Sequence, residues 1–550
     1  MKIGIICLFI LILYIVYNCM TDDTHENFES KKSVIVIGAG IAGLTTAQLL
    51  IDKGFDVVIL EARDRIGGRI YTNTTEFNQP IDFGASWIHG DRNQPLMTLK
   101  EKGNIETHID NEAIIMYSDG RRFTEDMQKI FEKTKEEIWA WVEDQDKNPK
   151  DYPNLFINGN SIKELLELNK TTLTNNYSEL NTIIYNDIWQ ESADNSGSDV
   201  ATLDRRGFAL GRNVEGEELI IVSGNIQLVN AVATPDTINK VQLNRPVKKI
   251  DYTSTQKVSV IDINDNKLDA DYVVCTIPLG VLKQPGNNSL FNPPLSETKI
   301  NSFKMVKAGL LTKFCMLFPY TFWSPESLIV LLPDNPTSYA YTPDNIDEAK
   351  MINDLLYYKS TIEDSVNIEN NASRIWKNYE ERWLNNLNNT QLNLINMSVV
   401  SKGQVNMLVA TFPGSLGWIA ERIDPAKLSN MIYRRLNKAF SMWWVNNMPD
   451  GSNLPPTIPI PIKTYCTKWS REPYSMQAYS YIGVGGTKQD VNNIKESLRD
   501  SNNNMRVVFA GEHTNVKYLA TSTAAFSSGY NAANKIFKDN NLPELPIPTN

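Results

Sequence analysis

The stretch Val34-Ile-Val-Ile-Gly38-Ala-Gly40-Ile-Ala-Gly43 decides the fold of this chain. Four β-branched residues predict a buried parallel strand, and Gly38 permits the tight turn that ends it. Gly40 allows the backbone to approach a pyrophosphate, and Gly43 allows the next helix to pack closely on the strand. The pattern predicts a Rossmann-like βαβ unit that holds a dinucleotide at the N-terminus of this helix.

The residues that follow complete the unit. We expect a helix over residues 41–53, closed by Gly54, and then a second strand over residues 55–60. This strand places Glu61 where its carboxylate can accept hydrogen bonds from ribose hydroxyls. A carboxylate in this position would repel a 2′-phosphate, which disfavours NADP.

Length and charge limit the classes of function. With 550 residues and 42% hydrophobic content, the chain should form two or more domains. The net charge of −10 argues against nucleic acid as a partner, because phosphate binding depends on clustered Lys and Arg. A cationic small molecule suits that charge better, although a solvated acidic surface explains it equally. The five cysteines show neither zinc spacing nor a disulfide framework, so we expect no metal, and Cys275 and Cys315 should be core residues.

The N-terminus carries an apolar run from Ile3 to Tyr17, with Lys2 before it and acidic residues after it. It predicts a signal anchor or signal peptide within residues 1–20. The run is short for a membrane span unless it extends to Met20. No small-x-small cleavage site follows, which favours membrane anchoring through residues 3–20, with a cleaved secretion signal as the alternative. Both interpretations place the catalytic body on the lumenal or extracellular side.

Periodicity outlines the rest of the chain. We expect mostly helix over residues 95–180, a polar loop at 194–198, strands at 247–250, 258–263, 272–276 and 309–318, a helix over 425–444 and a closing strand, turn and helix over 507–535. Cofactor-binding segments at both ends leave the middle of the chain for the substrate. The predicted segments are a signal anchor or signal peptide at 1–20, cofactor-domain parts at 33–92, 215–290 and 460–540, and substrate-domain parts at 93–214 and 291–459, the latter with a helical insertion at about 344–396.

Four motifs in this order resemble the flavin-containing amine oxidase family, and within it the polyamine oxidase branch. They are the glycine turn with Glu61 and Arg65-Ile-Gly-Gly-Arg69, then Gly84-Ala-Ser-Trp-Ile-His-Gly90, Pro278-Leu-Gly-Val-Leu-Lys283 and Gly511-Glu-His-Thr514. The resemblance extends over about residues 33–538, apart from the insertion and much of the helical region. It implies an α/β fold with a Rossmann-like FAD-binding domain and a discontinuous α+β substrate-binding domain.

Carried over position by position, the resemblance implies the residues that bind FAD. Ala478 stands where monoamine oxidases carry the cysteine that bonds to flavin, so FAD should be non-covalent. The family often has Gly-Ala where this chain has Ala524-Ala525, which puts the packing beside the flavin in question. The implied cofactor-binding residues are Gly38, Gly40, Gly43, Glu61, Arg63, Gly68 and Arg69 at the adenosine and pyrophosphate, Val247 at the adenine through its backbone, Gly84, Ala85 and Trp87 along the flavin, Glu512 at the ribityl or phosphate region, and Thr521 near the second aromatic position.

The same resemblance implies catalytic roles for Lys313, Tyr479 and His89. Lys313 matches the lysine that holds a water against the reactive flavin nitrogen, with a solvent-exposed strand-edge lysine as the alternative. Tyr479 matches an aromatic residue beside the flavin, and His89 matches the histidine at the mouth of the polyamine pocket. Glu191, His89 and Tyr479 are the candidate substrate contacts, although Glu191 fits a surface carboxylate equally well.

The reaction implied is oxidation of a polyamine or another amine by hydride transfer to flavin. Imine hydrolysis would follow, and molecular oxygen would be reduced to hydrogen peroxide. An L-amino-acid oxidase or a monoamine oxidase on the same fold is an alternative, and so is a membrane-anchored, non-catalytic flavoprotein with a binding or structural role. A chromatin demethylase is disfavoured by the apolar N-terminal segment and by the lack of an evident interaction module. The amine, the carbon attacked and the oligomeric state stay open.

Overall fold

The computed structural model describes residues 31–110, 113–147, 161–164, 178–210, 214–284, 289–335, 387–447 and 457–550. The predicted N-terminal anchor lies outside these residues, and so does the predicted insertion as far as residue 386. Within the described ranges, no helix has both the length and the apolar character needed to cross a membrane.

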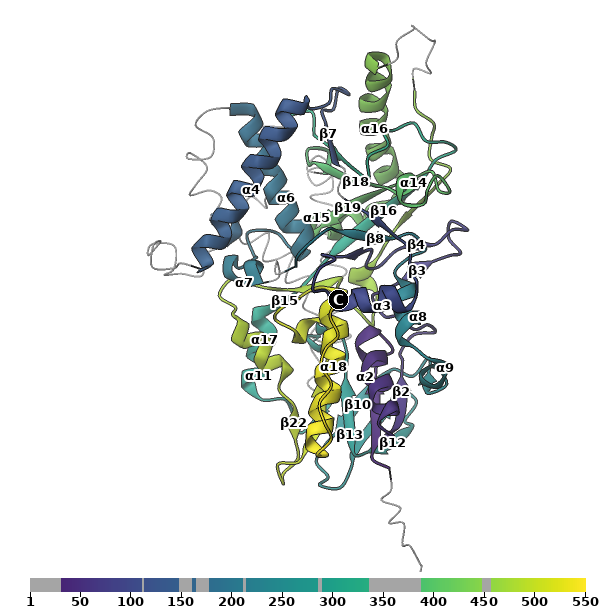
Figure 1. Ribbon diagram of the computed structural model, residues 1–550, viewed down its shortest axis with the longest axis vertical. Helices are drawn as coiled ribbons and strands as arrows, with labels where there is room; N and C mark the ends of the chain where they lie inside the picture. The colour runs from purple at the N-terminus through teal and green to yellow at the C-terminus, as the bar shows by residue number, and fades with distance from the viewer. Residues whose placement is uncertain are drawn as a thin grey trace, which may run out of the picture.

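The cofactor domain is built on a six-stranded sheet with the order β22-β23-β13-β1-β2-β9 (Figure 1). As predicted, the strand before the glycine turn is buried and parallel, and it pairs in parallel with a neighbour on each side. The sheet draws on three separate parts of the sequence. Its strands are β1 (Ser33–Ile37), β2 (Asp56–Leu60), β9 (Val241–Gln242), β13 (Tyr272–Cys275), β22 (Leu498–Arg499) and β23 (Met505–Phe509).

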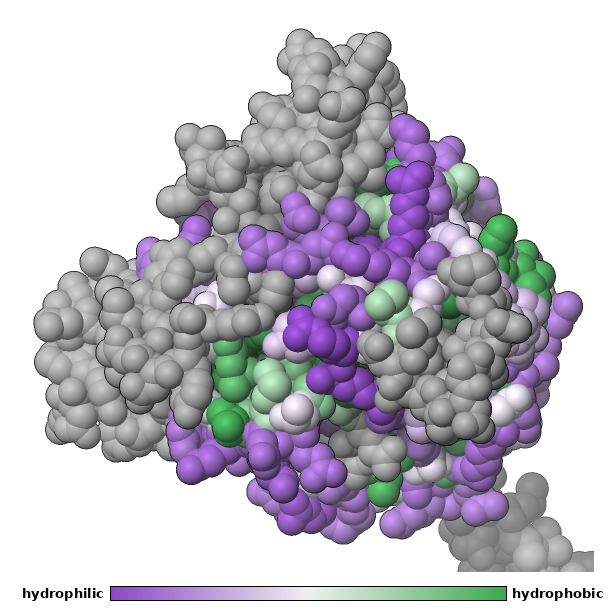
Figure 2. All heavy atoms as spheres, turned by 90° about the horizontal axis from the view of Figure 1, so that it is seen from above, coloured by the Kyte–Doolittle hydropathy of each residue, from purple (hydrophilic) through white to green (hydrophobic). Residues whose placement is uncertain are grey.

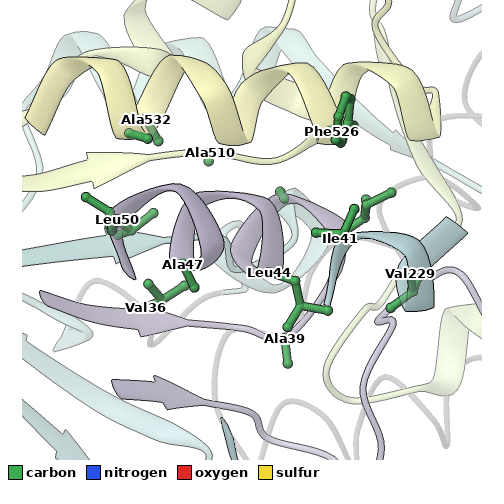
Figure 3. Close-up of a cluster of buried hydrophobic side chains, with 14 of the residues drawn as sticks. Val36, Ala39, Ile41, Leu44, Ala47, Leu50, Val229, Ala510, Phe526 and Ala532 are labelled. Atoms are coloured by element: carbon green, nitrogen blue, oxygen red, sulfur yellow. The ribbon is translucent and has the colours of Figure 1, made fainter. Parts of the chain in front are cut away.

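Two helices from opposite ends of the chain, α2 (Ile41–Asp52) and α18 (Ser522–Asp539), pack side by side on this sheet. Figure 3 shows Leu44 and Leu50 of α2 in the apolar cluster that α2 shares with β1 and α18. Their close approach depends on Gly529, where an added Cβ would lie 2.7 Å from Thr45 Cβ. Burial of this interface is the main favourable term that joins the two ends of the chain.

The second large sheet has the order β20-β16-β19-β18-β17-β7. Helix α16 (Pro425–Asn447) packs on one face through a large apolar cluster, and α4 (Glu125–Lys147) and α6 (Ser178–Ser196) cover the other face. These helices lie at the upper end of the molecule in Figure 1. The strands are β7 (Ala113–Met116), β16 (Leu311–Leu317), β17 (Leu328–Leu331), β18 (Leu392–Asn396), β19 (Met407–Pro413) and β20 (Lys463–Cys466).

Smaller elements connect the two sheets. The three-stranded sheet β5-β8-β6 consists of β5 (Trp87–Ile88), β6 (Thr107–Ile109) and β8 (Leu219–Ile221). The other strands are β3 (Thr72–Asn73), β4 (Ile81–Asp82), β10 (Val247–Asp251), β11 (Val258–Asp262), β12 (Lys267–Ala270), β14 (Phe291–Asn292), β15 (Val306–Gly309) and β21 (Tyr479–Ile482). The other helices are α3 (Pro95–Lys102), α7 (Arg205–Leu210), α8 (Ile226–Val232), α9 (Pro235–Ile238), α10 (Leu279–Leu282), α11 (Glu297–Met305), α14 (Met397–Val400), α15 (Gly414–Ala420), α17 (Lys488–Lys495), η4 (Trp469–Arg471) and η5 (Glu512–Thr514).

Several sequence boundaries differ from the structure. The region predicted as mostly helical contains β6 and β7, and the predicted loop at 194–198 begins inside α6. The predicted insertion at 344–396 extends too far, because Leu392–Asn396 forms the interior strand β18, whose hydrogen bonds come from β17 and β19. Strand β20 joins the second sheet although it falls in the predicted cofactor segment 460–540, and α3 packs in the cofactor-domain core although it falls in the predicted substrate segment 93–214. In these segments, contacts with residues far apart in the sequence determine the structure, and the local hydrophobic pattern does not.

The surface seen from above is mainly hydrophilic where Figure 2 colours it, and hydrophobic residues form small groups between the polar ones.

Cys275, Cys315 and Cys466 are buried and free, so the prediction that Cys275 and Cys315 are core residues is confirmed.

Candidate active site

A cavity of about 860 Å³ extends from the glycine turn to helix α6, with walls contributed by both large sheets. Most of the residues predicted for the site meet in it, although they come from distant parts of the chain. Gly43 and Val247 are not among the lining residues. The predicted residues that line it are Gly38, Gly40, Glu61, Arg63, Gly68, Arg69, Gly84, Ala85, Trp87, His89, Glu191, Lys313, Tyr479, Glu512 and Thr521.

The glycine turn has the geometry that a bound pyrophosphate requires. Gly38 has φ +105°, and a Cβ there would lie 2.3 Å from Thr276 Oγ1. A Cβ at Gly43 would lie 2.0 Å from the carbonyl oxygen of Gly38, so Gly43 serves helix packing instead of lining the cavity. No side chain caps α2 at Gly40, and Ile41 and Ala42 face the cavity. The first backbone N–H groups of α2 can therefore bind an anion.

Glu61 follows β2 and is buried at the edge of the cavity. Its carboxylate accepts hydrogen bonds from the backbone N–H groups of Ala39, at 2.7 Å, and Arg63, at 2.9 Å. These bonds fix the carboxylate beside the glycine turn. Its contact with ribose stays a prediction.

Two arginines of the predicted cofactor set occupy the same wall. Arg63 contacts Glu472 and donates to Ser475 Oγ at 2.9 Å, while its buried Nε has no partner. Arg69 donates to Glu512 Oε1 at 2.8 Å. Burial raises the pKa of Glu512, but several opposing effects, of which the charge of Arg69 is the largest, together hold this pKa below its ordinary value, so the carboxylate is ionised.

Of the other two predicted cofactor residues, Thr521 lines the cavity and Val247 does not. Thr521 caps α18 by accepting from Ala524 N at 3.0 Å, and it lines the cavity as the first residue before that helix. The N-terminus of α18 is thus already capped, unlike that of α2. Val247 begins β10, packs its side chain against an apolar cluster and is not among the lining residues, so its predicted backbone contact with the adenine stays a prediction.

Lys313 lies on the interior strand β16 and is 4% exposed, which rules out the alternative of a solvent-exposed edge lysine. Its ammonium donates to Asp82 O at 3.0 Å, to Gly84 O at 2.6 Å and to Ser86 Oγ. Burial lowers its pKa, and Asp82 partly opposes this effect. Burial also raises the pKa of Asp82 to about 6. The amine is therefore tied to the predicted flavin-facing segment 84–87.

Trp87 on β5 and His89, which follows β5 directly, lie at another wall of the cavity. Trp87 Nε1 donates to Asp110 at 2.8 Å, and His89 Nδ1 lies 2.7 Å from Glu218 Oε2. Sequence reasoning found neither acidic partner. The pattern Glu215-Gly-Glu-Glu218 is an acidic signal that could have pointed to Glu218.

Tyr479 on β21 contacts the end of α6, because its hydroxyl donates to the backbone carbonyl of Asp194. Asp187, Glu191 and Asp194 follow one face of α6 at i, i+4 and i+7, and all three line the cavity. Lys135 of α4 lies 2.6 Å from Asp187 and 2.9 Å from Glu191. Glu191, the predicted substrate contact, is therefore already ion-paired.

Asp194 differs from the other two carboxylates. It accepts hydrogen bonds from two neutral amides, Asn393 at 2.8 Å and Gln190 at 3.3 Å, and it forms no ion pair within the described residues. Burial raises its pKa to about 7, with Asp187 and Glu191 contributing in the same direction. Sequence analysis missed Asp194 as a candidate because it placed the residue in a polar loop, although the spacing of the three acids along a helix could have indicated it.

The cavity fits FAD. It offers an uncapped helix N-terminus for the phosphates, an unsatisfied buried donor on Arg63 and walls that come from both domains. The described lining residues include no cysteine, and the described residues contain no cluster that could hold a metal ion.

Comparisons with known proteins agree with this geometry. The family model described as flavin containing amine oxidoreductase matches residues 41–537. Lysine-specific histone demethylase 1 homolog 2 of Oryza sativa subsp. japonica is 27% identical over 513 residues, covering 92% of this chain and 57% of that protein. Lysine-specific histone demethylase 2 of Homo sapiens is 25% identical over 520 residues, covering 92% of this chain and 53% of that protein. The chain thus spans little more than half the length of these relatives.

Among solved structures, a triple mutant of putrescine oxidase with redesigned cofactor binding has a TM-score of 0.65 at 15% identity, covering 92% of this chain and 99% of that one. This likeness shows the shared fold. The family match, which covers most of the sequence, shows that the chain belongs to the flavin-containing amine oxidoreductase family and that its cofactor is FAD.

Proposed function

We propose that this protein is an FAD-dependent oxidase of a polyamine, or of another amine with a second positive charge. The observation that carries the proposal is the carboxylate of Asp194, which lines the cavity beside Tyr479 without a cationic partner among the described residues. A buried carboxylate in this setting is stabilised by a ligand cation.

FAD, when bound, supplies the hydride acceptor, and its reoxidation by molecular oxygen yields hydrogen peroxide. The residues of the chain prepare the amine. The reacting nitrogen must lose its proton, because the lone pair assists hydride departure from the adjacent carbon. Apolar and aromatic side chains such as Phe131 and Tyr479 line this end of the cavity, and a desolvated environment lowers the pKa of an amine. Water then hydrolyses the imine product to an aldehyde and a shorter amine.

Lys313 is the proposed catalytic lysine on the flavin-facing wall. Its fixed position against Asp82, Gly84 and Ser86 keeps a polar N–H group in an otherwise buried region. Tyr479 forms part of the wall that orients the substrate, and its hydroxyl is fixed by Asp194. The cofactor is held non-covalently, which agrees with Ala478 and the absence of cysteine among the described lining residues.

The distal ammonium of the substrate binds Asp194. Asp187 and Glu191 share the charge of Lys135, so α6 presents three carboxylates against one lysine. A monoamine makes no use of this arrangement. An L-amino-acid oxidase needs a cation for the substrate carboxylate, but Arg63, Arg69, Lys135 and Lys313, the cations that line the described cavity, are each bonded to protein oxygens.

Demethylation of a methylated lysine side chain is the second candidate, favoured by the names of the two demethylase relatives. It uses the same chemistry on a cationic amine.

We further propose that the apolar segment at residues 3–20 anchors the protein in a membrane, with the catalytic body on the lumenal or extracellular side.

A peroxide-release assay on the purified flavoprotein, from Thr21 onward, tests these alternatives. Spermine, spermidine, putrescine, benzylamine, leucine and a dimethyl-lysine peptide are compared at equal concentration. We expect the polyamines to give at least a ~10-fold higher kcat/KM than benzylamine, a difference of ~1.4 kcal/mol in transition-state binding. Preference for the peptide would favour the demethylase. The absence of peroxide with every substrate, despite bound flavin, would favour a non-catalytic flavoprotein.

A further inference from the structure

Glu218 contacts His89 at the wall of the cavity, and no part of the amine-oxidase assignment gives Glu218 a role. We propose that Glu218 is a positioning residue that orients His89 and enables it to take the proton from the incoming substrate ammonium. This inference rests on the proposed function, because it assigns the step that turns the substrate into its reactive, neutral form.

The backbone places the two side chains opposite each other. Strands β5 and β8 are antiparallel, with Trp87 opposite Ile220 and Ile88 opposite Leu219. The next position across the ladder brings His89 beside Glu218, and their Nδ1 and Oε2 atoms lie 2.7 Å apart. Cross-strand neighbours at this separation interact directly.

The backbones of Glu218 and His89 each accept a hydrogen bond from a neighbouring segment. Asp110 N donates to Glu218 O at 2.8 Å, which joins this end of β8 to β6. Gln94 Nε2 donates to His89 O at 2.8 Å, and Gln94 Oε1 accepts from Thr523 Oγ1 of α18 at 3.0 Å. The pair is therefore anchored to both the small sheet and the cofactor domain.

The contact fixes the role of each imidazole nitrogen. Nδ1 donates its proton to the carboxylate of Glu218, so Nε2 is the nitrogen left to meet a ligand in the cavity. Neutral His89 can then accept a proton at Nε2, and the imidazolium that forms stays beside a carboxylate. Burial lowers the pKa of His89, but Glu218 outweighs burial and raises this pKa above its ordinary value.

Other charged groups near this wall have separate partners. Asp110 accepts from Trp87 Nε1 and from Ser327 Oγ, and Asp91 accepts from Glu217 N. The carboxylate of Glu215 accepts from Asn93 Nδ2 at 3.5 Å. Within the described residues, Glu218 is thus the carboxylate in contact with the His89 ring.

The proton balance is simple. The N–H bond of the substrate ammonium breaks, an Nε2–H bond forms on His89, and the electron pair stays on the amine nitrogen. No electron is exchanged in this step. The side chains of His89 and Glu218 are 38% and 40% exposed, so the proton can pass to water before the next turnover.

The test compares Glu218→Gln with Glu217→Gln, which removes the same charge from an exposed neighbour. Anaerobic flavin reduction by spermine is measured by stopped flow from pH 5.5 to 9.5. In the parent protein the rate should rise with pH through the pKa of His89, because only neutral His89 accepts the proton. Glu218→Gln should shift this rise to lower pH by at least about one pH unit and lower the plateau rate roughly 10-fold. Glu217→Gln should leave the profile unchanged.

A second measurement is independent of turnover. The chain has four histidines, so selective isotope labelling and a His89→Gln variant assign the His89 signal in NMR spectra. Glu218→Gln should lower the measured pKa of His89, whereas Glu217→Gln should not. An unchanged His89 pKa in Glu218→Gln, or an unchanged pH profile in a folded, flavin-loaded variant, would overturn the inference. A third outcome separates the two proposals. If Glu218→Gln lowers the pKa of His89 but no amine reduces the flavin of the parent protein, the proposed function and the proton step are both wrong. The contact between Glu218 and His89 would still stand.

Discussion

The guanidinium of Arg69 lies 2.8 Å from the carboxylate of Glu512, although 443 residues separate them in the chain. Arg69 follows the glycine turn, and Glu512 follows the last strand of the same sheet. Both residues line the cofactor cavity, so this ion pair joins a segment near the start of the chain to one near its end.

Replacement of Arg69 by alanine should release FAD. The change leaves the buried Glu512 carboxylate without its cation, which costs about 3–5 kcal/mol. We expect purified Arg69→Ala to show a much lower flavin absorbance and a lower Tm that excess FAD partly restores. Arg121→Ala, which alters an exposed pair with Asp119, is the control and should retain flavin. Full flavin content in Arg69→Ala would contradict the role of this pair.

Replacement of Lys313 by methionine should impair turnover while retaining the cofactor. The substitution keeps the length of the side chain but removes the donor to Gly84 O and Ser86 Oγ. We expect at least a ~10-fold lower kcat with spermine, measured by peroxide release, and a flavin spectrum near that of the parent. Lys304→Met changes an exposed lysine on α11 and should leave kcat unchanged. An unaltered kcat in Lys313→Met would exclude a catalytic lysine at this position.

The affinity for a polyamine should depend on the ionisation of Asp194. Burial raises its pKa to about 7, so the side chain is neutral below this pH and attracts the distal ammonium only above it. KM for spermine should therefore fall as pH rises through about 7. Asp194→Asn should remove this pH step and raise KM about 10-fold at pH 8, through the loss of roughly 1.4 kcal/mol.

The control for this prediction is Asp126→Asn, an exposed carboxylate in the first turn of α4, which should behave as the parent protein does. Benzylamine has no second charge, so its KM should show no dependence on Asp194. A similar rise in KM for both amines in Asp194→Asn would indicate a general disturbance of the cavity.

Two glycine substitutions should separate a steric effect from a conformational one. Alanine at Gly43 would place its Cβ 2.0 Å from Gly38 O, which forces β1 and α2 apart and should cost more than about 3 kcal/mol. Alanine at Gly54 meets no neighbouring atom, and the φ of +84° costs only about 1–2 kcal/mol. We expect Gly43→Ala to lose FAD or to be insoluble, and Gly54→Ala to bind FAD with a modestly lower Tm. Equal Tm values would show that the close approach at Gly43 relaxes easily.

The cofactor domain could be predicted because its signals are local. The turn at Gly38, the helix after Gly40 and the strand before Glu61 follow from the conformational limits of neighbouring residues. Strand β18 was missed because the Asn-rich sequence before Leu392 extends a helical pattern, whereas the strand is specified by pairing with β17 and β19. The predicted backbone contact of Val247 with the adenine stays a prediction, since the packing of its side chain against an apolar cluster does not test it.

The sequence by itself determined the βαβ unit, the family and the cofactor, because each depends on residues that are close together along the chain or on motifs in a fixed order. Only the tertiary structure decided which acids line the cavity beside Tyr479 and His89. Asp194 meets Tyr479 across 285 residues, and Glu218 meets His89 across two paired strands. The charge and orientation of such side chains depend on burial and on partners brought together by folding, and neither property is encoded in local spacing.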